Sequence, residues 1–247
     1  MPTVSQFKLI QSLKDKKRRE EQGLFVAEGI KVVQELLHST GFPIQKLYFT
    51  SGSGIEQDLA KMPVALQELV SEKDMERMSL LQTPGSVLAL VKQPSYSFSG
   101  FPEKQWSLLL DGIQDPGNLG TIIRLADWFG INNIFATPDT ADCFGPKVVQ
   151  ASMGSLFRVK VTYGACNLWL QEARVPIYGT AMQGRSIWQQ QQVPPGVLVI
   201  GNEGKGIRDE VGTHISTVFS IPRLGQAESL NAGVATGIIL SHLLATK

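Results

Sequence analysis

The chain has 247 residues, of which 43% are hydrophobic, and its formal net charge at neutral pH is +1. This length suits one large domain or two modest ones with real cores, and the small charge excludes a polyelectrolyte surface over the whole molecule. Cys143 and Cys166 have no paired spacing, so we interpret both as ordinary thiols in a reducing compartment. Without a signal peptide or a ~20-residue apolar run, we expect a cytoplasmic protein with no membrane segment.

The first third of the chain predicts short helices and strands. A polar, basic helix is expected over residues 5–20, with Phe7, Ile10 and Leu13 on its buried stripe. The patterns that follow predict strands at 24–27, 46–50 and 87–91 and helices at 30–37 and 72–81. A stretch rich in proline, serine and glycine then marks a domain boundary. We therefore divide the chain into a domain at 1–95, a linker at 96–104 and a second domain at 105–247.

A basic run interrupts the polar surface of the first predicted helix. It consists of Lys14, Lys16, Lys17, Arg18 and Arg19. Such a run is typical of a solvated helix face, and it is equally able to contact the phosphates of a nucleic acid.

The second domain has the pattern of a parallel α/β sheet. Strands are predicted at 107–110, 134–136, 177–180, 197–200 and 218–221, and helices at 119–129 and 230–244. In an open sheet of this kind, ligands bind beyond the carboxyl ends of the strands. Three segments at such ends carry the residues of interest.

The first segment follows the strand at 107–110. Asp115-Pro116-Gly117 forms a turn, and Asn118 is placed to cap the next helix. Arg124 falls off the buried stripe formed by Leu119, Ile122, Ile123 and Ala126. A structural cap and a surface cation are the simple interpretations of these two polar residues; a functional pair above the sheet edge is the alternative.

The other two segments follow the strands at 197–200 and 218–221. Gly201-Asn202-Glu203-Gly204-Lys205-Gly206 allows close approach of backbone to a ligand, but it has neither the dinucleotide-binding nor the P-loop spacing. Ser229 is suited to cap the last helix, whereas Asn231 is a poor helix former near its start. His38, His214 and His242 lack metal-ligand spacing, and no hydrolase nucleophile motif is present, so we expect no metal.

Together these segments resemble the SpoU (TrmH-like) branch of the SPOUT RNA methyltransferases. The match lies in Asn118-Leu119-Gly120 with Arg124, in Gly201-Asn202-Glu203-Gly204, and in Ile221-Pro222 with Glu228-Ser229-Leu230-Asn231. The N-terminal part is similar, more loosely, to that family's L30e-like substrate-binding domain, through Lys17-Arg18-Arg19 and the run 23–29.

The resemblance implies a fold, a reaction and a set of site residues. It implies an α/β methyltransferase domain with a trefoil knot, preceded by a smaller α/β L30e-like domain, in a homodimer whose active site lies at the subunit interface. It implies S-adenosylmethionine bound near Thr180, Gly201, Ile221 and Leu230. The family's catalytic positions map onto Arg124, Asn118, Glu203, Ser229 and Asn231, and Lys16, Lys17, Arg18 and Arg19 are expected to bind RNA.

The expected reaction is methylation of a ribose 2′-hydroxyl in ribosomal RNA. The additional N-terminal domain favours ribosomal RNA over the main alternative, transfer RNA. A non-catalytic RNA-binding protein is a second alternative, against which the presence of Arg124, Glu203 and Asn231 argues. Methylation of a base is a third, and the segment 228–231 favours ribose.

Overall fold

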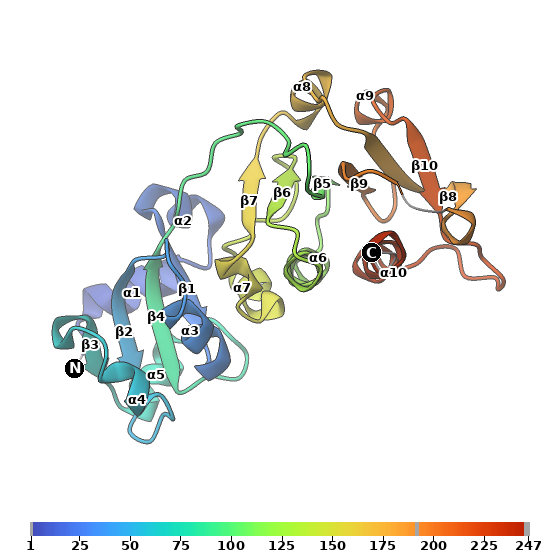
Figure 1. Ribbon diagram of the computed structural model, residues 1–247. Coiled ribbons are helices and arrows are strands. Elements are labelled where there is room, and N and C mark those ends of the chain that lie inside the picture. Colours follow the sequence, from blue (N-terminus) through green and yellow to red (C-terminus); the bar gives the residue numbers. More distant parts are fainter. Residues whose placement is uncertain (1, 191–192, 245–247) are drawn as a thin grey trace. The chain divides into compact units, whose positions relative to one another are not determined.

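The computed structural model describes residues 2–190 and 193–244, which fold into two compact units (Figure 1). Unit 1 comprises the chain up to Ser95 together with Asp142–Arg158, and unit 2 comprises Tyr96–Ala141 together with the chain from Val159 onward. Among the described residues, no helix is long and apolar enough to cross a membrane.

Unit 1 is built on a four-stranded sheet. Its strands, in spatial order, are β1 (Leu24–Glu28), β4 (Val87–Lys92), β2 (Ile44–Phe49) and β3 (Gln67–Leu69). Strand β4 runs antiparallel to both β1 and β2, while β3 runs parallel to β2. The core includes Ile10, Val26, Tyr48 and Met78 from helices and strands. Besides two helices at the N-terminus, the first 95 residues form α3 (Ile30–Leu37), α4 (Glu56–Leu59), α5 (Glu72–Met78) and the 3-10 turn η1 (Val64–Leu66).

The predicted single helix at 5–20 is wrong, because the chain forms two helices there. Helix α1 (Val4–Ser12) and helix α2 (Lys16–Gln22) are separated by a turn that begins at Leu13. Asp15 starts the second helix, since its side chain accepts a hydrogen bond of 2.8 Å from the Lys17 backbone N–H. The predicted buried stripe is confirmed: Ile10 and Leu13 are fully buried and Phe7 packs against them.

Unit 2 contains a six-stranded sheet, which is parallel throughout, as the sequence predicted, but has one strand more than predicted. Its strands, in spatial order, are β10 (Thr217–Ser220), β8 (Ile177–Ser186), β9 (Val197–Gly201), β5 (Ser107–Asp111), β6 (Asn133–Ala136) and β7 (Lys160–Tyr163). Strand β7 was not predicted, because Lys160-Val161-Thr162-Tyr163 lacks the continuous apolar character of its neighbours. The carboxyl ends of these strands share one edge of the sheet.

Helices lie against both faces of this sheet. Helices α6 (Pro116–Trp128) and α10 (Ala232–Leu244) lie side by side on one face, and α8 (Cys166–Gln171) and α9 (Asp209–Gly212) lie on the other (Figure 1). The stripe predicted on α6 is fully buried. Helix α10 begins at Ala232, so Ser229 and Leu230 belong to the preceding loop and not to the helix. A short turn, η3 (Ile187–Gln189), follows β8.

The segment expected to be a linker is anchored in unit 2. Phe98 stacks on Trp169 with ring centroids 4.5 Å apart, and Phe101 meets Phe135 edge-on at 4.8 Å. These rings close the end of the hydrophobic core beneath α8.

Unit 1 also includes a segment from the second half of the chain, Asp142–Arg158, which is called the excursion below. The excursion carries helix α7 (Pro146–Ser152) and the turn η2 (Ser155–Phe157). Phe144 packs against Phe25 with ring centroids 4.8 Å apart, and Asp142 pairs with Arg19 at 2.6 Å. The contiguous division expected from the sequence does not contain this excursion.

Candidate active site

Helix α6 presents Asn118 at the exit of β5. Asp115 is the N-cap of this helix, and its Oδ1 accepts a hydrogen bond of 2.8 Å from the Asn118 backbone N–H. The expectation that Asn118 itself caps the helix is therefore wrong. Because Asp115 performs that role, the Asn118 side chain is left for other contacts, although its residue is only 8% exposed.

A relay of hydrogen bonds joins the three segments singled out in the sequence. Asn231 Nδ2 donates to Asn118 Oδ1 at 2.6 Å, and Asn118 Nδ2 donates to Glu203 Oε1 at 2.5 Å. Each amide thus donates in one direction and accepts from the other, which fixes the orientation of Asn118. The relay brings residues from the exits of β5, β9 and β10 to one place at the sheet edge.

Asn231 also begins helix α10. Its Oδ1 accepts a hydrogen bond of 3.2 Å from Val234 N–H, and its backbone carbonyl accepts one of 2.9 Å from Ala235 N–H. The residue is therefore a cap, which explains how an asparagine is tolerated beside so apolar a helix. The Oδ1 atom of its side chain therefore caps the helix, while the Nδ2 atom takes part in the relay.

The glycine-rich segment after β9 forms a tight, internally bonded loop. Asn202 and Gly206 exchange backbone hydrogen bonds of 3.0 and 2.9 Å, and Asn202 Oδ1 accepts from the N–H groups of Gly204 and Lys205. A Cβ at Gly201 would lie 2.4 Å from the Gly206 carbonyl carbon. Only glycine therefore permits this loop to fold back onto the end of the strand.

Two residues that the sequence analysis did not single out anchor this loop. Asn202 Nδ2 donates to the Gly112 carbonyl at 2.7 Å, and the Arg208 Nε donates to Asp111 Oδ1 at 2.6 Å. Hydrogen bonding to Asp111 raises the pKa of Arg208. The available sequence signal was an aspartate that ends an otherwise apolar strand, since a buried carboxylate requires a partner.

Arg124 and Ser229 lie outside the relay. Both residues are exposed, Arg124 on the fourth position after Gly120 in α6 and Ser229 in the loop before α10. Among the described residues, neither side chain has a hydrogen-bond or ion-pair partner in the structure. Of the five expected catalytic residues, the structure thus joins three and leaves two open to an incoming molecule.

The expected cofactor residues combine backbone groups with apolar side chains. Thr180 Oγ1 donates to the Val199 carbonyl at 3.1 Å where β8 parts from β9, and Gly201 ends β9. Ile221 directly follows β10 and is half-buried, while Leu230 is 46% exposed. Strand-end backbone and exposed aliphatic carbon suit a nucleoside, which needs directional hydrogen bonds at its edge and apolar contact on its faces.

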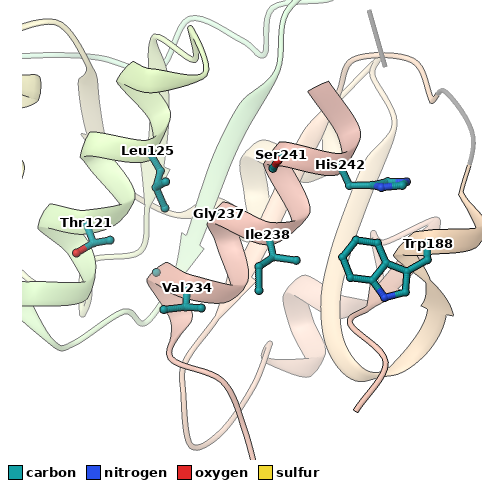
Figure 2. Close-up of a pocket in the computed structure, with 9 residues that line it drawn as sticks. Thr121, Leu125, Trp188, Val234, Gly237, Ile238, Ser241 and His242 are labelled. Carbon is teal, nitrogen blue, oxygen red and sulfur yellow. The ribbon is translucent and has the colours of Figure 1, made fainter. Parts of the chain in front are cut away.

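An open apolar groove of about 670 Å³ runs along α6 and α10 (Figure 2). Its walls include Leu125 from α6, Val234 and Ile238 from α10, and Trp188 from η3. Val234 is 51% exposed and Trp188 is 55% exposed. So much exposed apolar surface in one place is typical of an interaction site.

The four basic residues expected to bind RNA divide into two groups. Lys16, Lys17 and Arg18 are exposed on α2, where Lys16 faces Glu20 at 4.0 Å and Arg18 bonds Glu21 at 2.8 Å. Arg19 is only 4% exposed, pairs with Asp142, and donates to the carbonyls of Leu13 and Lys14. The guanidinium of Arg19 therefore makes contacts inside unit 1, whereas its three neighbours are exposed to solvent.

Comparison with protein families assigns both parts of the chain. Residues 105–241 match the SpoU rRNA Methylase family, and residues 5–89 match the MRM3-like substrate binding domain. The chain is 32% identical to the 23S rRNA (guanosine(2553)-2′-O)-methyltransferase RlmP of Bacillus subtilis, over 94% of this chain and 92% of that protein.

Solved structures of similar proteins cover the whole chain. A putative RNA methyltransferase of the TrmH family from Porphyromonas gingivalis is 34% identical, with a TM-score of 0.85 and complete coverage of both chains. An AdoMet-bound rRNA methyltransferase from Sinorhizobium meliloti is 32% identical, with a TM-score of 0.85 over 98% of this chain and 96% of that one.

Proposed function

Because this chain belongs to the SpoU rRNA methylase family, we propose that it transfers a methyl group from S-adenosylmethionine to a ribose 2′-hydroxyl of ribosomal RNA. The observation that carries this proposal is the relay from Asn231 through Asn118 to Glu203. It is supported by RlmP, whose name specifies 2′-O-methylation of 23S rRNA, and by the AdoMet-bound relative from Sinorhizobium meliloti.

The reaction requires alignment and the loss of one proton. A bond forms between the ribose 2′-oxygen and the methyl carbon, the carbon–sulfur bond breaks, and the hydroxyl proton leaves. S-adenosylmethionine, when bound, supplies a methyl group activated by its positively charged sulfur. The protein's part is to hold the hydroxyl in line and to stabilise the charge that develops on its oxygen.

The relay assigns roles to the residues at the strand ends. Since the amide of Asn118 donates to Glu203 and accepts from Asn231, we assign it the role of positioning these two side chains. The second carboxylate oxygen of Glu203 has no partner among the described residues, so it is available to orient Arg124 or to accept a hydrogen bond from the ribose. We assign Ser229 to the contact with the hydroxyl.

Arg124 is proposed to stabilise the forming alkoxide as a cation. Arginine stays protonated in proteins, which makes it a poor proton acceptor. The alternative role, Arg124 as the base, predicts that the rising limb of the pH–rate profile moves to lower pH in Arg124→Lys, because lysine loses its proton more easily. The cation role predicts a slower enzyme with an unshifted limb.

S-adenosylmethionine is proposed to bind at Thr180, Gly201, Ile221 and Leu230. The backbone of Gly201 is held by its pairing with Asp111 in the sheet, and Leu230 offers an apolar cover. We further propose, from membership of this family, that the chain around these strands is threaded as a trefoil knot. We also propose a cytoplasmic location.

Unit 1 is proposed to bind the RNA. Its match to a substrate binding domain supports this assignment, and Lys16, Lys17 and Arg18 present three cations on one short helix. Arg19 is left out of the contact surface, because its pair with Asp142 occupies it. Structured RNA is recognised chiefly by shape and by exposed loops, which one basic helix can contact through phosphates.

A second copy of the chain is proposed to cover the groove on α6 and α10. Arg124 lies on the same helix as the groove residues Thr121 and Leu125, so a partner seated there would border the active site. Val234→Arg is expected to give a monomer of 27.0 kDa by light scattering, whereas Leu168→Arg, an equally exposed site on α8, should leave a dimer. A wild-type monomer would refute the proposal.

The reaction is tested with purified protein and methyl-labelled S-adenosylmethionine. Label is expected in large-subunit ribosomal RNA and, after digestion, in a 2′-O-methylated nucleoside. Label on a base would refute the ribose chemistry, and label on transfer RNA alone would change the substrate. Binding of RNA without methyl transfer to either ribosomal or transfer RNA would favour a non-catalytic RNA-binding protein.

A further inference from the structure

A cluster of charged side chains at the exits of β5 and β6 lies outside the relay. Arg208 meets Asp111 in three ways: its backbone N–H donates to Oδ2 at 2.7 Å, its Nε donates to Oδ1 at 2.6 Å, and its Nη2 lies 2.5 Å from Oδ1. The same Nη2 donates to Asp139 Oδ1 at 3.0 Å. The Asp111 side chain is completely buried, whereas the Arg208 side chain is 42% exposed.

This cluster fixes the end of the glycine-rich loop, and Asn202 fixes its beginning. Asn202 bonds the Gly112 carbonyl, the residue directly after Asp111. Both ends of the loop are therefore fastened to two consecutive residues at the exit of β5. A Cβ at Gly112 would lie 3.2 Å from Asp139 Oδ2 and 3.9 Å from Arg208 Nη2, so the Asp139 carboxylate lies close to that backbone and the Arg208 guanidinium is in contact range.

Glu203 lies between the two fastened ends. The next two residues, Gly204 and Lys205, donate their backbone N–H groups to Asn202 Oδ1 within the loop, whereas the side chain of Glu203 accepts a hydrogen bond from Asn118 in the relay. The place of its carboxylate thus depends on the two anchors at β5. Arg208 supplies the stronger of the two anchors, because its charged guanidinium contacts the Asp111 carboxylate through both Nε and Nη2.

We propose that Arg208 is a positioning residue for methyl transfer: its contacts with Asp111 and Asp139 hold the loop so that Glu203 meets Asn118. This inference rests on the proposed function, because it assigns the purpose of the same site. Gly201 is held separately by strand pairing with Asp111, so cofactor binding should depend little on Arg208. The effect of losing Arg208 should therefore fall on the rate of transfer and leave affinity for S-adenosylmethionine unchanged.

The first test is a double-mutant cycle in single-turnover methyl transfer. Arg208→Met should slow the step about 10- to 100-fold, with affinity for S-adenosylmethionine within about threefold of wild type. In an enzyme that already carries Glu203→Ala, the same change should have no further effect, because nothing is left to position. Equal losses in both backgrounds, or a loss of cofactor affinity instead of rate, would overturn the proposal.

Two further variants separate positioning from folding. Arg208→Lys keeps the charge that buried Asp111 requires but loses the two-point geometry, so it should fold normally and still be slowed. Arg174→Met removes an exposed arginine elsewhere in unit 2 and should match wild type. A fully active Arg208→Lys would contradict the proposed geometry.

The second test does not depend on activity. Hydrogen exchange at the Gly204 and Lys205 amides reports whether the loop stays closed, since both N–H groups bond Asn202. Faster exchange there in Arg208→Lys, with β9 unchanged, is expected even if the protein proves to act on no RNA. That result would preserve the loop anchor while refuting the proposed function; unchanged exchange would refute the anchor itself.

Discussion

The Nδ2 of Asn231 lies 2.6 Å from the Oδ1 of Asn118, although the two residues are 113 positions apart in the chain. This contact joins the start of α10 to the start of α6, and Asn118 passes the connection on to Glu203. The proposed active site therefore combines residues from three strand exits, which the side-chain amide of Asn118 links. Single substitutions at these residues are therefore expected to have distinct effects.

Asn118→Ala should slow methyl transfer about 100-fold without loss of S-adenosylmethionine affinity. The change removes the amide that bonds both Asn231 and Glu203, and misplacement of reacting groups by about 1 Å costs a rate factor of this size. Single-turnover rates and calorimetric binding measure the two quantities. Asn132→Ala, at an exposed site, is the matched control; equal rates in the two variants would contradict the relay.

Gly201→Ala should destabilise the protein by about 1–3 kcal/mol, as overpacking does. The new methyl carbon would stand 2.4 Å from the Gly206 carbonyl carbon, so the loop after β9 must move. Gly204→Ala provides a control in the same loop, because the nearest atom to its Cβ is Asn202 Oδ1 at 3.6 Å. Urea unfolding compares them, and similar free energies of unfolding would contradict the close approach.

Replacing Lys16, Lys17 and Arg18 together with alanine should weaken RNA binding and leave S-adenosylmethionine binding intact. For every phosphate that the protein no longer neutralises, the magnitude of the slope of log affinity against log salt should fall by about 0.7 to 0.9, so removing all three cations lowers it by about 2 to 3. Filter binding at several salt concentrations measures the slope. An unchanged affinity at low salt would rule out this helix as an RNA-binding element.

Arg19→Ala, in the same helix, should have a different consequence. It leaves the carboxylate of Asp142 without its partner at a site where the arginine is 4% exposed and the aspartate 14% exposed. Breaking a buried ion pair in this way costs about 3–5 kcal/mol, so thermal unfolding should shift downward. The three alanine substitutions at its exposed neighbours should leave thermal unfolding unchanged.

Cys166 should make the stability of the protein depend on alkaline pH. Burial, followed by the nearby Asp111 carboxylate, raises the pKa of its thiol to about 12 from a reference value of 9.0. Above pH 9 the unfolded chain loses this proton while the folded chain keeps it, so the stabilisation present at lower pH is lost as the pH rises towards 12. Wild type should lose about 1 kcal/mol relative to Cys166→Ala between pH 9 and 10 in urea unfolding. A constant difference would contradict the shift.

The meeting of Asn118, Glu203 and Asn231 could be anticipated from sequence. All three follow apolar strands, and the carboxyl ends of parallel strands share one edge. The contacts of Asn202 and Arg208 could not, because they require that β9 pair with β5, a strand distant in sequence, as well as with β8, its predecessor in the chain. Periodicity identifies strands but does not give their order in the sheet.

The burial of Arg19 was equally hidden. A run of four consecutive cations, Lys16 to Arg19, indicates an exposed helix face, yet the partner of Arg19 is 123 positions away, in an excursion from the other half of the chain. The break between α1 and α2 carried a local signal in Asp15, a favoured N-cap residue. The basic charge on both sides of it concealed that signal.

Methylation of a ribosomal RNA ribose by this protein is tested most directly by mapping 2′-O-methylation at nucleotide resolution in total RNA from cells with and without it. We predict that one ribose mark disappears from ribosomal RNA, and that the gene for the wild-type protein restores it while the Asn118→Ala gene does not. An unchanged map of ribosomal RNA, with or without a mark lost from transfer RNA, would contradict the assignment.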